Sequence, residues 1–259
     1  MAKRKHKVSF SGGKDSSAML LRMIELGMPI DEVLFCDTGK EFPQLYAYVK
    51  RMQLYVESLG IKFTTIQPKN NKTWDEGFFG RLSRGKLEGK VRGWPLMIFH
   101  CWWSRDAKFV PLNKVCEGHE RYIGFAADET KRLRQSREKD GYNFPLADWG
   151  WTESDALDYL KSVGWAEEFH LDFNRTGCFL CPKQGGASLE TLCRKYPEQW
   201  AELLYYAKAS HEGGDDWASN EFKPGVGYPE LLDLERQVKE NPDTPIHKNA
   251  VCGGCAFAA

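Results

Sequence analysis

The chain has 259 residues, of which 42% are hydrophobic and 28% are charged, an ordinary balance for a globular protein. Its 36 basic and 36 acidic side chains give a formal net charge of +0, which argues against a protein dedicated to non-specific nucleic-acid binding. No apolar run is long enough to span a membrane, and no signal-peptide core follows the basic first residues. We therefore expect a cytoplasmic protein without a membrane partner, whose eight cysteines are reduced thiols or metal ligands.

The first apolar run ends in a glycine turn that opens a helical pattern. Residues 8–11 predict a strand, and the apolar spacing over residues 16–26 predicts the helix after it. Gly12 and Gly13 let the backbone turn tightly and approach an anion closely. The first amides of the helix then point at that anion, and Lys14 adds a full positive charge. The anion is expected to be a nucleotide phosphate.

The spacing separates this turn from two common phosphate-binding motifs. A Walker A loop reads Gly-x-x-x-x-Gly-Lys followed by Ser or Thr, whereas here Asp15 follows the lysine and Val8 stands five residues before Gly13. The chain also lacks the Gly-x-Gly-x-x-Gly pattern of dinucleotide-binding folds. The alternative without a ligand is a plain strand-to-helix turn.

The next elements continue the alternation of strand and helix. Short apolar strands are expected at residues 32–36 and 62–66, with a helix over residues 42–58 between them. The resulting β-α-β-α-β order predicts a parallel sheet with right-handed crossovers. Residues 68–99 break the pattern and are interpreted as an irregular insertion beside the site.

The second half of the chain is less regular. A helix is expected over residues 102–116, with Pro111 as a misfit that divides it, and a strand over residues 122–125. Thr152 and Asp155 resemble a capping box that opens a helix over residues 153–163. The remaining expectations are a charged loop over 127–143, helices over 187–194 and 197–210, and a loose tail over 211–259.

Together these elements predict an α/β fold, a Rossmann-like parallel sheet with helices on both faces. We expect a nucleotide-binding domain over residues 1–165 with the insertion at 68–99, and a helical, cysteine-containing region over residues 166–259.

Three polar segments follow strands that should end at the same edge of the sheet, where ligands bind in open parallel sheets. A carboxylate at Asp37 or Asp128 can hold Mg²⁺ or a ribose hydroxyl, and Arg132 can pair with a phosphate. Each of these residues, taken alone, also suits a polar turn. The expected nucleotide-binding residues are Ser9, Ser11, Gly12, Gly13, Lys14, Asp15, Ser16, Asp37, Thr38, Gly39, Gly124, Asp128 and Arg132.

The order of the motifs resembles the phosphoadenosine phosphosulfate reductase family of the PP-loop adenine nucleotide α-hydrolase superfamily. The resemblance covers roughly residues 7–182 and includes similarity to phage and bacterial members and to the ATP-dependent sulfur-transfer members of DNA phosphorothioation. It implies a PP-loop fold and cleavage of ATP between the α and β phosphates. The segments that carry it are Ser-Gly-Gly-Lys-Asp-Ser (11–16), Asp-Thr-Gly-x-Glu-Phe-Pro (37–43), Lys-x-x-Pro-Leu (108–112), Gly-x-x-x-Asp-Glu-Thr-x-x-Arg (residues 124 to 132, with one spacing difference) and Gly-Cys-x-x-Cys-Pro (177–182).

The chain departs from the pattern of that family in three ways that bear on the reaction. It keeps the full Gly-Gly-Lys-Asp-Ser loop, which favours ATP cleavage over a ready-made sulfonucleotide. It lacks the C-terminal Glu-Cys-Gly-x-His nucleophile of the reductases, and the nearest segment is Val-Cys-Gly-Gly-Cys at residues 251–255. The family's Gly-x-Arg is Gly-Phe-Ala at residues 124–126, so the resemblance does not carry over the phosphate contact of that arginine.

Two Cys-x-x-Cys pairs predict a metal site of four thiolates, Cys178 and Cys181 with Cys252 and Cys255. The pairs lie about 70 residues apart, so the tail must fold back over the site. The resemblance implies a 4Fe–4S cluster near the nucleotide, with Zn²⁺ as the alternative. Cys101 and Cys193 are alternative ligands or persulfide carriers, and a redox dithiol at the second pair is a further interpretation.

The working hypothesis is an ATP- and Mg²⁺-dependent sulfur-transfer or adenylating enzyme, with Lys14, Asp15 and Cys252 as its catalytic residues. The sulfur acceptor is a nucleic acid or a small molecule, and a partner protein can supply the sulfur. One alternative is a thiol-dependent reductase of a phosphosulfate nucleotide. Another is a non-enzymatic subunit that binds nucleotide or nucleic acid and holds a structural zinc.

Overall fold

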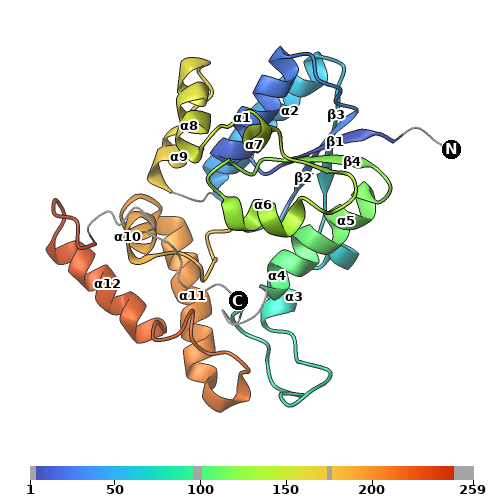
Figure 1. Ribbon diagram of the computed structural model, residues 1–259. Coiled ribbons are helices and arrows are strands. Elements are labelled where there is room, and N and C mark those ends of the chain that lie inside the picture. The colour runs from blue at the N-terminus through green and yellow to red at the C-terminus, as the bar shows by residue number, and fades with distance from the viewer. Residues whose placement is uncertain (1–3, 96–100, 174–176, 248–259) are drawn as a thin grey trace. The chain divides into compact units, whose positions relative to one another are not determined.

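The computed structural model describes residues 4–95, 101–173 and 177–247 (Figure 1). The expected metal ligands Cys252 and Cys255 lie outside the described residues. The chain divides into two compact units, one of residues 1–70, 106–171 and 175–177, the other of residues 71–105, 172–174 and 178–259. Most of the segment expected as an insertion therefore belongs to the second unit.

The first unit is built on a five-stranded parallel sheet in the order β3-β2-β1-β4-β5. This confirms the expected α/β fold. The strands are β1 (His6–Phe10), β2 (Glu32–Cys36), β3 (Lys62–Ile66), β4 (Glu120–Ile123) and β5 (Tyr142–Asn143).

The helices of this unit lie around the sheet (Figure 1). The chain steps from β1 outward to β2 and β3, then returns to the other side of β1 for β4 and β5. With right-handed crossovers, that reversal puts α1 and α2 on one face and α5 and α6 on the other. The helices are α1 (Lys14–Glu25), α2 (Pro43–Ser58), α5 (Val110–Cys116), α6 (Thr130–Ser136), α7 (Pro145–Asp148), α8 (Glu153–Ser162) and α9 (Glu168–Asp172).

The direction of the chain reverses between β1 and β4, which makes the gap between their carboxyl ends the topological switch point of the sheet. Ligands of open parallel sheets bind at this point. Residues 11–16, hereafter the glycine loop, leave the end of β1 there.

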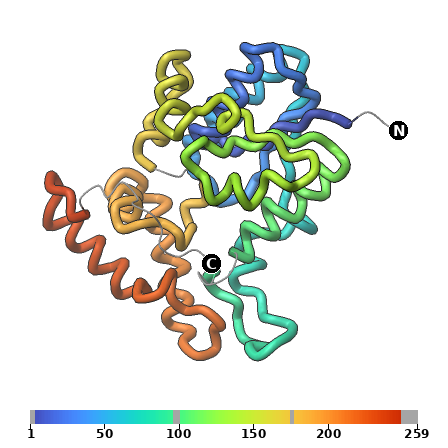
Figure 2. The backbone as a smooth tube through the Cα atoms, viewed as in Figure 1, coloured from blue at the N-terminus to red at the C-terminus, as the bar shows by residue number. Residues whose placement is uncertain are grey.

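The segment expected as one divided helix follows a continuous helical path (Figure 2). The turn α4 (Trp102–Ser104) passes into a π-helical turn (Arg105–Phe109) and then into α5. Pro111 stands in the first turn of α5, where its missing N–H costs nothing. The proline therefore marks a change of helical pitch.

The second unit has an aromatic core made by residues from distant parts of the chain. Trp94, Phe78 and Phe222 are almost completely buried, and their rings pack edge to face. The indole of Trp94 donates to the buried hydroxyl of Ser210 at 3.0 Å. The helical elements of this unit are η1 (Lys69–Asn71) at its border, α3 (Trp74–Phe78), α4, α10 (Gly186–Lys195), α11 (Pro197–Gly213), η3 (Gly214–Asp216) and α12 (Tyr228–Glu240).

Two sequence expectations were wrong. The charged loop over residues 127–143 contains α6 and β5, because its charges lie on the exposed side while Leu133 packs against Ile123 and Phe144. The tail over residues 211–259 contains η3 and α12, whose Leu231 and Val238 are buried at helical spacing. Glycine and charge density had obscured both patterns.

Candidate active site

The glycine loop turns at Gly12, whose φ of +75° lies in the left-handed region that glycine adopts without strain. A Cβ at this position would lie 3.1 Å from Val49 Cγ2 and 3.2 Å from Leu45 Cδ1, both on α2. The loop therefore needs glycine at residue 12 both for its backbone angle and for its packing.

Serine side chains on either side of the glycines hold the loop in shape. The backbone N–H of Ser11 donates to Ser16 Oγ at 3.1 Å, and Ser16 Oγ donates to Gly13 O at 3.1 Å. The two hydroxyls lie 3.0 Å apart, so Ser11 Oγ donates to Ser16 Oγ. No side chain caps the N-terminus of α1, which leaves its first amides directed at the switch point.

His170 on α9 fixes the loop from the other side, and sequence reasoning did not find it. Its Nε2 lies 2.9 Å from Gly12 O, and its Nδ1 accepts from the backbone N–H of Glu167 at 3.1 Å. This places the proton on Nε2, which donates to the loop carbonyl. Burial lowers the pKa of His170 and keeps the ring neutral.

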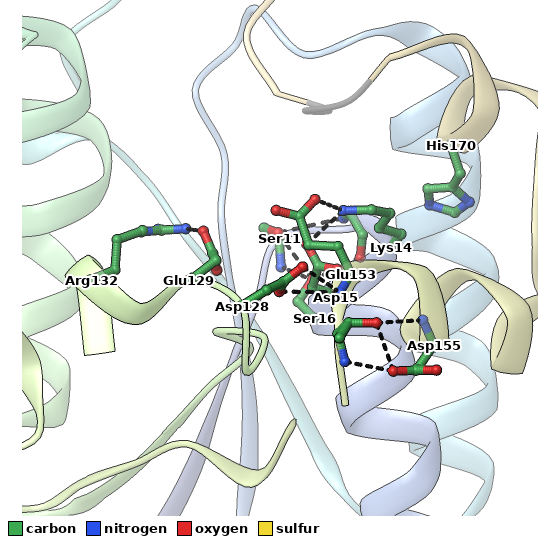
Figure 3. A network of polar contacts seen from close by, with 12 residues as sticks. Ser11, Lys14, Asp15, Ser16, Asp128, Glu129, Arg132, Glu153, Asp155 and His170 are labelled. Carbon is green, nitrogen blue, oxygen red and sulfur yellow. Dashed lines mark hydrogen bonds and ion pairs between the residues drawn. The ribbon is translucent and has the colours of Figure 1, made fainter. Parts of the chain in front are cut away.

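Lys14 lies between two carboxylates (Figure 3). Its Nζ is 2.6 Å from Glu153 Oε2, at the start of α8, and 3.0 Å from Asp15 Oδ2. Burial alone would lower the pKa of Lys14, but the two carboxylates outweigh burial and raise it. The ammonium is therefore fully charged, and it is positioned before any nucleotide arrives.

Asp15 is the most perturbed acid of the site. Burial, together with the nearby charges of Glu153 and Glu129, raises its pKa to about 6 despite the opposing effect of Lys14. Its Oδ1 is buried and has no hydrogen-bond partner. An oxygen in this state suits a hard cation such as Mg²⁺, which binds through one or two carboxylates plus phosphate oxygens. The site thus fits Mg²⁺ bound together with a nucleotide.

The end of β4 approaches the glycine loop closely at Gly124. A Cβ there would lie 3.0 Å from both Cα and N of Ser16, so only glycine lets the two backbones meet. Further along, Asp128 accepts from the backbone N–H of Glu153 at 3.3 Å. Asp128 therefore helps to position the acid that holds Lys14 (Figure 3).

At the end of β2, Asp37 Oδ1 accepts from the Gly39 N–H at 2.8 Å and from the Tyr46 hydroxyl at 2.6 Å. Thr38 Oγ1 donates to Glu41 Oε1 at 2.9 Å. These hydrogen bonds fix the conformation of the Asp37–Gly39 turn, at the sheet edge where a nucleotide would lie.

Glu41 was missed as a site residue. Its side chain is 1% exposed, and its Oε1 accepts from Lys108 Nζ at 2.9 Å. Its Oε2 is buried without a hydrogen-bond partner. A buried carboxylate oxygen without a partner is costly, so this atom marks a place where a ligand donor is expected. Glu41 is the last residue of the Asp-Thr-Gly-x-Glu motif, and its partner Lys108 is the first residue of the Lys-x-x-Pro-Leu motif.

Two other expected residues have partners within the protein. Arg132 forms an ion pair with Glu129 and lies over the Phe125 ring, with 3.9 Å from its Cζ to the ring centroid. Ser9 lies inside β1, and its hydroxyl accepts from Arg121 Nε at 2.8 Å. Contact of either side chain with a nucleotide stays a prediction.

Cys178 and Cys181 lie on one turn of the second unit, in which the Cys181 N–H donates to Cys178 O at 3.1 Å. Within residues 4–95, 101–173 and 177–247, no three His, Cys, Asp or Glu side chains form a metal-binding group. A four-thiolate site therefore requires the pair at residues 252 and 255. Burial raises the pKa of the Cys193 thiol to about 11 in the absence of a metal, and a role for Cys101 or Cys193 as an alternative ligand stays a prediction.

The fold and loop define an α/β protein with a glycine loop at the switch point of a parallel sheet. Residues 5–184 match the phosphoadenosine phosphosulfate reductase domain, and the chain belongs to that family. The named relatives include the phosphoadenosine 5'-phosphosulfate reductase of Alkalilimnicola ehrlichii, 26% identical over 152 residues that cover 56% of each chain.

Other similar proteins include two without an assigned activity and one solved structure of low sequence identity. Two uncharacterized proteins of Methanocaldococcus jannaschii are 28% and 26% identical, over 76% and 81% of this chain and 46% and 43% of their own lengths. The chain thus spans about half the length of the curated relatives it matches. A solved structure, the U34-tRNA thiolase NcsA from Methanococcus maripaludis with its 4Fe–4S cluster, has a TM-score of 0.43 and 14% identity, covering 100% of this chain and 79% of that chain.

No helix of the described residues is both long enough and apolar enough to cross a membrane.

Proposed function

We propose that this protein is an ATP-dependent sulfur-transfer enzyme that cleaves ATP between the α and β phosphates. The observation that carries the proposal is the complete glycine loop at the switch point. It has an uncapped helix N-terminus and a buried lysine held between two carboxylates. This arrangement favours a polyphosphate bound with a divalent cation.

The described residues have distinct tasks in such a reaction. The first amides of α1 bind the β and γ phosphates, and Lys14 neutralises the charge that develops on the leaving pyrophosphate. Asp15 and Glu153 are oxygen ligands suited to Mg²⁺, which would supply further charge neutralisation when bound. His170 holds the Gly12 carbonyl away from the phosphates by donating a hydrogen bond to its oxygen.

The chemical steps balance as two displacements. An acceptor oxygen attacks the α phosphorus, the bond to the bridging oxygen breaks, and pyrophosphate leaves. A sulfur nucleophile then attacks the activated carbon of the acceptor and displaces AMP, which takes the original acceptor oxygen with it. Cys178 and Cys181, together with Cys252 and Cys255, are the residues proposed to hold a 4Fe–4S cluster, which would supply a site for delivery of sulfur.

We propose a nucleic acid as the acceptor, on the basis of a basic hairpin in the second unit. Arg81 pairs with Val91 across the hairpin, which contains Arg84, Lys86 and Lys90. Arg84 and Lys86 are exposed and form no ion pair among the described residues, whereas Lys90 is partly exposed and interacts electrostatically with Asp216. Exposed cations without an ion-pair partner are available to phosphates of a polynucleotide.

The test of the reaction uses ATP labelled on the α phosphate, with Mg²⁺, sulfide and total nucleic acid extracted from the organism that makes this protein. We expect labelled AMP and unlabelled pyrophosphate, and we expect Lys14→Met to abolish both. Lys50→Met, on the exposed side of α2, is the matched control. Release of ADP and phosphate in place of AMP and pyrophosphate would contradict the proposal.

A phosphosulfate-nucleotide reductase is the second candidate, supported by the named relatives of the family. Calorimetry with ATP and with phosphoadenosine phosphosulfate separates the two, since a reductase binds only the second tightly. Sulfite release with a dithiol reductant, lost in Cys252→Ser, would establish the reductase instead.

A further inference from the structure

A buried arginine in β4 has no charged partner. Arg121 is 7% exposed, and its guanidinium donates from Nε to Ser9 Oγ at 2.8 Å. Its Nη1 donates to Asn113 Oδ1 at 2.9 Å and to the Tyr142 hydroxyl at 3.2 Å. All three acceptors are uncharged, and Nη2 has no partner in the described part of the chain.

The carboxylates closest in sequence to this arginine are engaged elsewhere. Glu120 and Asp140 form ion pairs with Arg4 at 3.0 and 2.7 Å. On the neighbouring strands, Glu32 is paired with Lys7 at 3.4 Å. Leaving a buried cation without a counter-charge is costly, and buried charges in proteins are usually paired.

Arg121 lines a cavity of about 360 Å³ at the amino end of β4, the end of the strand opposite to Gly124 and the glycine loop. This volume lies within the range of small-molecule sites. The lining includes Asn113, Lys114 and His119, as well as the acidic Glu117 and Asp140.

The polar groups of the cavity are mainly donors. The Lys5 N–H approaches His119 Nδ1 at 3.4 Å, which leaves the ring proton on Nε2 as a further donor. Lys114 is exposed and has no ion-pair partner among the described residues. Glu117 is also exposed and forms no ion pair with Arg121. The innermost charge is therefore positive.

We propose that this cavity binds a small molecule or ion through an oxyanion group, a phosphate, sulfate or carboxylate. One of its oxygens accepts from Arg121 Nη2, and Lys114 adds a favourable charge at the opening. The cavity lies at the amino end of β4, whereas the glycine loop meets Gly124 just beyond its carboxyl end, although Arg121 also reaches Ser9 of β1. The proposal does not depend on the function proposed above.

The experiment is calorimetric titration with inorganic phosphate, sulfate and acetate at constant ionic strength. It is done on protein carrying Lys14→Met, which removes the lysine charge of the glycine loop, and the Arg121 and Lys114 variants below separate binding in the cavity from binding to the remaining backbone amides of α1. We expect saturable binding of at least one probe. Binding of phosphate and sulfate alone assigns a phosphate-like head group, binding of acetate alone assigns a carboxylate, and binding of all three assigns a general oxyanion site.

Two variants connect that binding to the cavity. Arg121→Met is expected to abolish it, and Lys114→Glu is expected to weaken it at least tenfold while leaving the fold intact, because Lys114 is exposed. Lys50→Glu makes the same charge change on α2 and is expected to have less than a twofold effect. Absence of saturable binding, or equal binding in the Lys114→Glu and Lys50→Glu proteins, would overturn the proposal even if Arg121→Met does not fold.

Discussion

Replacement of His170 by phenylalanine tests whether a remote helix holds the glycine loop. The centroid of the His170 ring lies 4.8 Å from that of Tyr48 and 4.1 Å from that of Phe169, and phenylalanine keeps an aromatic ring at this position. It removes the bonds of 2.9 Å to Gly12 O and 3.1 Å to the Glu167 N–H. Because each buried group left unsatisfied costs roughly 1–3 kcal/mol and two groups lose their partner, we expect a loss of about 2–6 kcal/mol in the free energy of unfolding.

Urea unfolding and ATP calorimetry measure the two consequences. We expect ATP affinity to fall at least tenfold, because the freed Gly12 carbonyl can turn toward the phosphates. His170→Gln can restore the donor to Gly12 O and should recover part of both losses. His211→Phe, on an exposed position of α11, is the control. Stability and ATP affinity equal to those of the unmodified protein would refute this account of the loop.

The same histidine gives a pH dependence with a defined sign. Burial lowers the folded-state pKa of His170, so the unfolded chain binds a proton more readily. Its contribution to stability is therefore present above the unfolded pKa of about 6.5 and is lost as the pH falls toward the folded value. Because Asp15 contributes to stability with the opposite sign over this range in both proteins, the test is the difference between unfolding free energies of the unmodified protein and His170→Phe, which should shrink as the pH falls from 7.5 to 5.

Three further changes test the rest of the site. The pKa of Asp15 is raised from 3.8 to about 6, so ionisation of Asp15 lowers the free energy of unfolding as the pH rises through this range. In urea unfolding at pH 7.5, Asp15→Asn should therefore be up to about 3 kcal/mol more stable, and it should lose Mg²⁺-dependent ATP binding. Unchanged stability would contradict the burial of this charge. Gly124→Ala places a Cβ 3.0 Å from the Ser16 backbone and should cost about 1–3 kcal/mol and weaken ATP binding, whereas Gly185→Ala, with open space around it, should do neither. Iron and sulfide analysis of anaerobically purified protein should give four iron and four sulfide per chain, as a 4Fe–4S cluster requires. Cys178→Ser should lose this iron and sulfide, whereas Cys193→Ser should keep them. Zinc in place of iron would establish the structural-metal alternative.

The sequence was informative where the functional residues are neighbours along the chain. The glycine loop, its strand and its helix lie within 20 residues, and local rules predict all three. The acid that holds Lys14 belongs to the first turn of α8, next to the capping box that was recognised, but only the fold shows that α8 lies against α1. The sequence carries no comparable local signal for this contact.

Residues that act across the fold were missed for the same reason. His170 contacts a carbonyl 158 positions away, and Arg121 contacts Ser9 at a separation of 112. A single histidine or arginine in an apolar context usually serves packing or a surface ion pair. Their importance follows from the groups they contact, and those contacts exist only after β1, β4 and α9 come together.

The way α10 binds the end of the described chain affects how the tail cysteines can be studied. Buried Glu190 accepts from the N–H groups of Ile246 and His247 at 3.0 and 2.8 Å. Arg194 donates to the carbonyls of Asn241, Pro242 and Thr244. A truncation after residue 240 would remove five hydrogen-bond partners from buried Glu190 and partly exposed Arg194, along with the tail cysteines. Loss of activity in a shortened protein would then report a damaged helix, so serine substitutions in the full-length chain are the cleaner way to assign a role to the thiols.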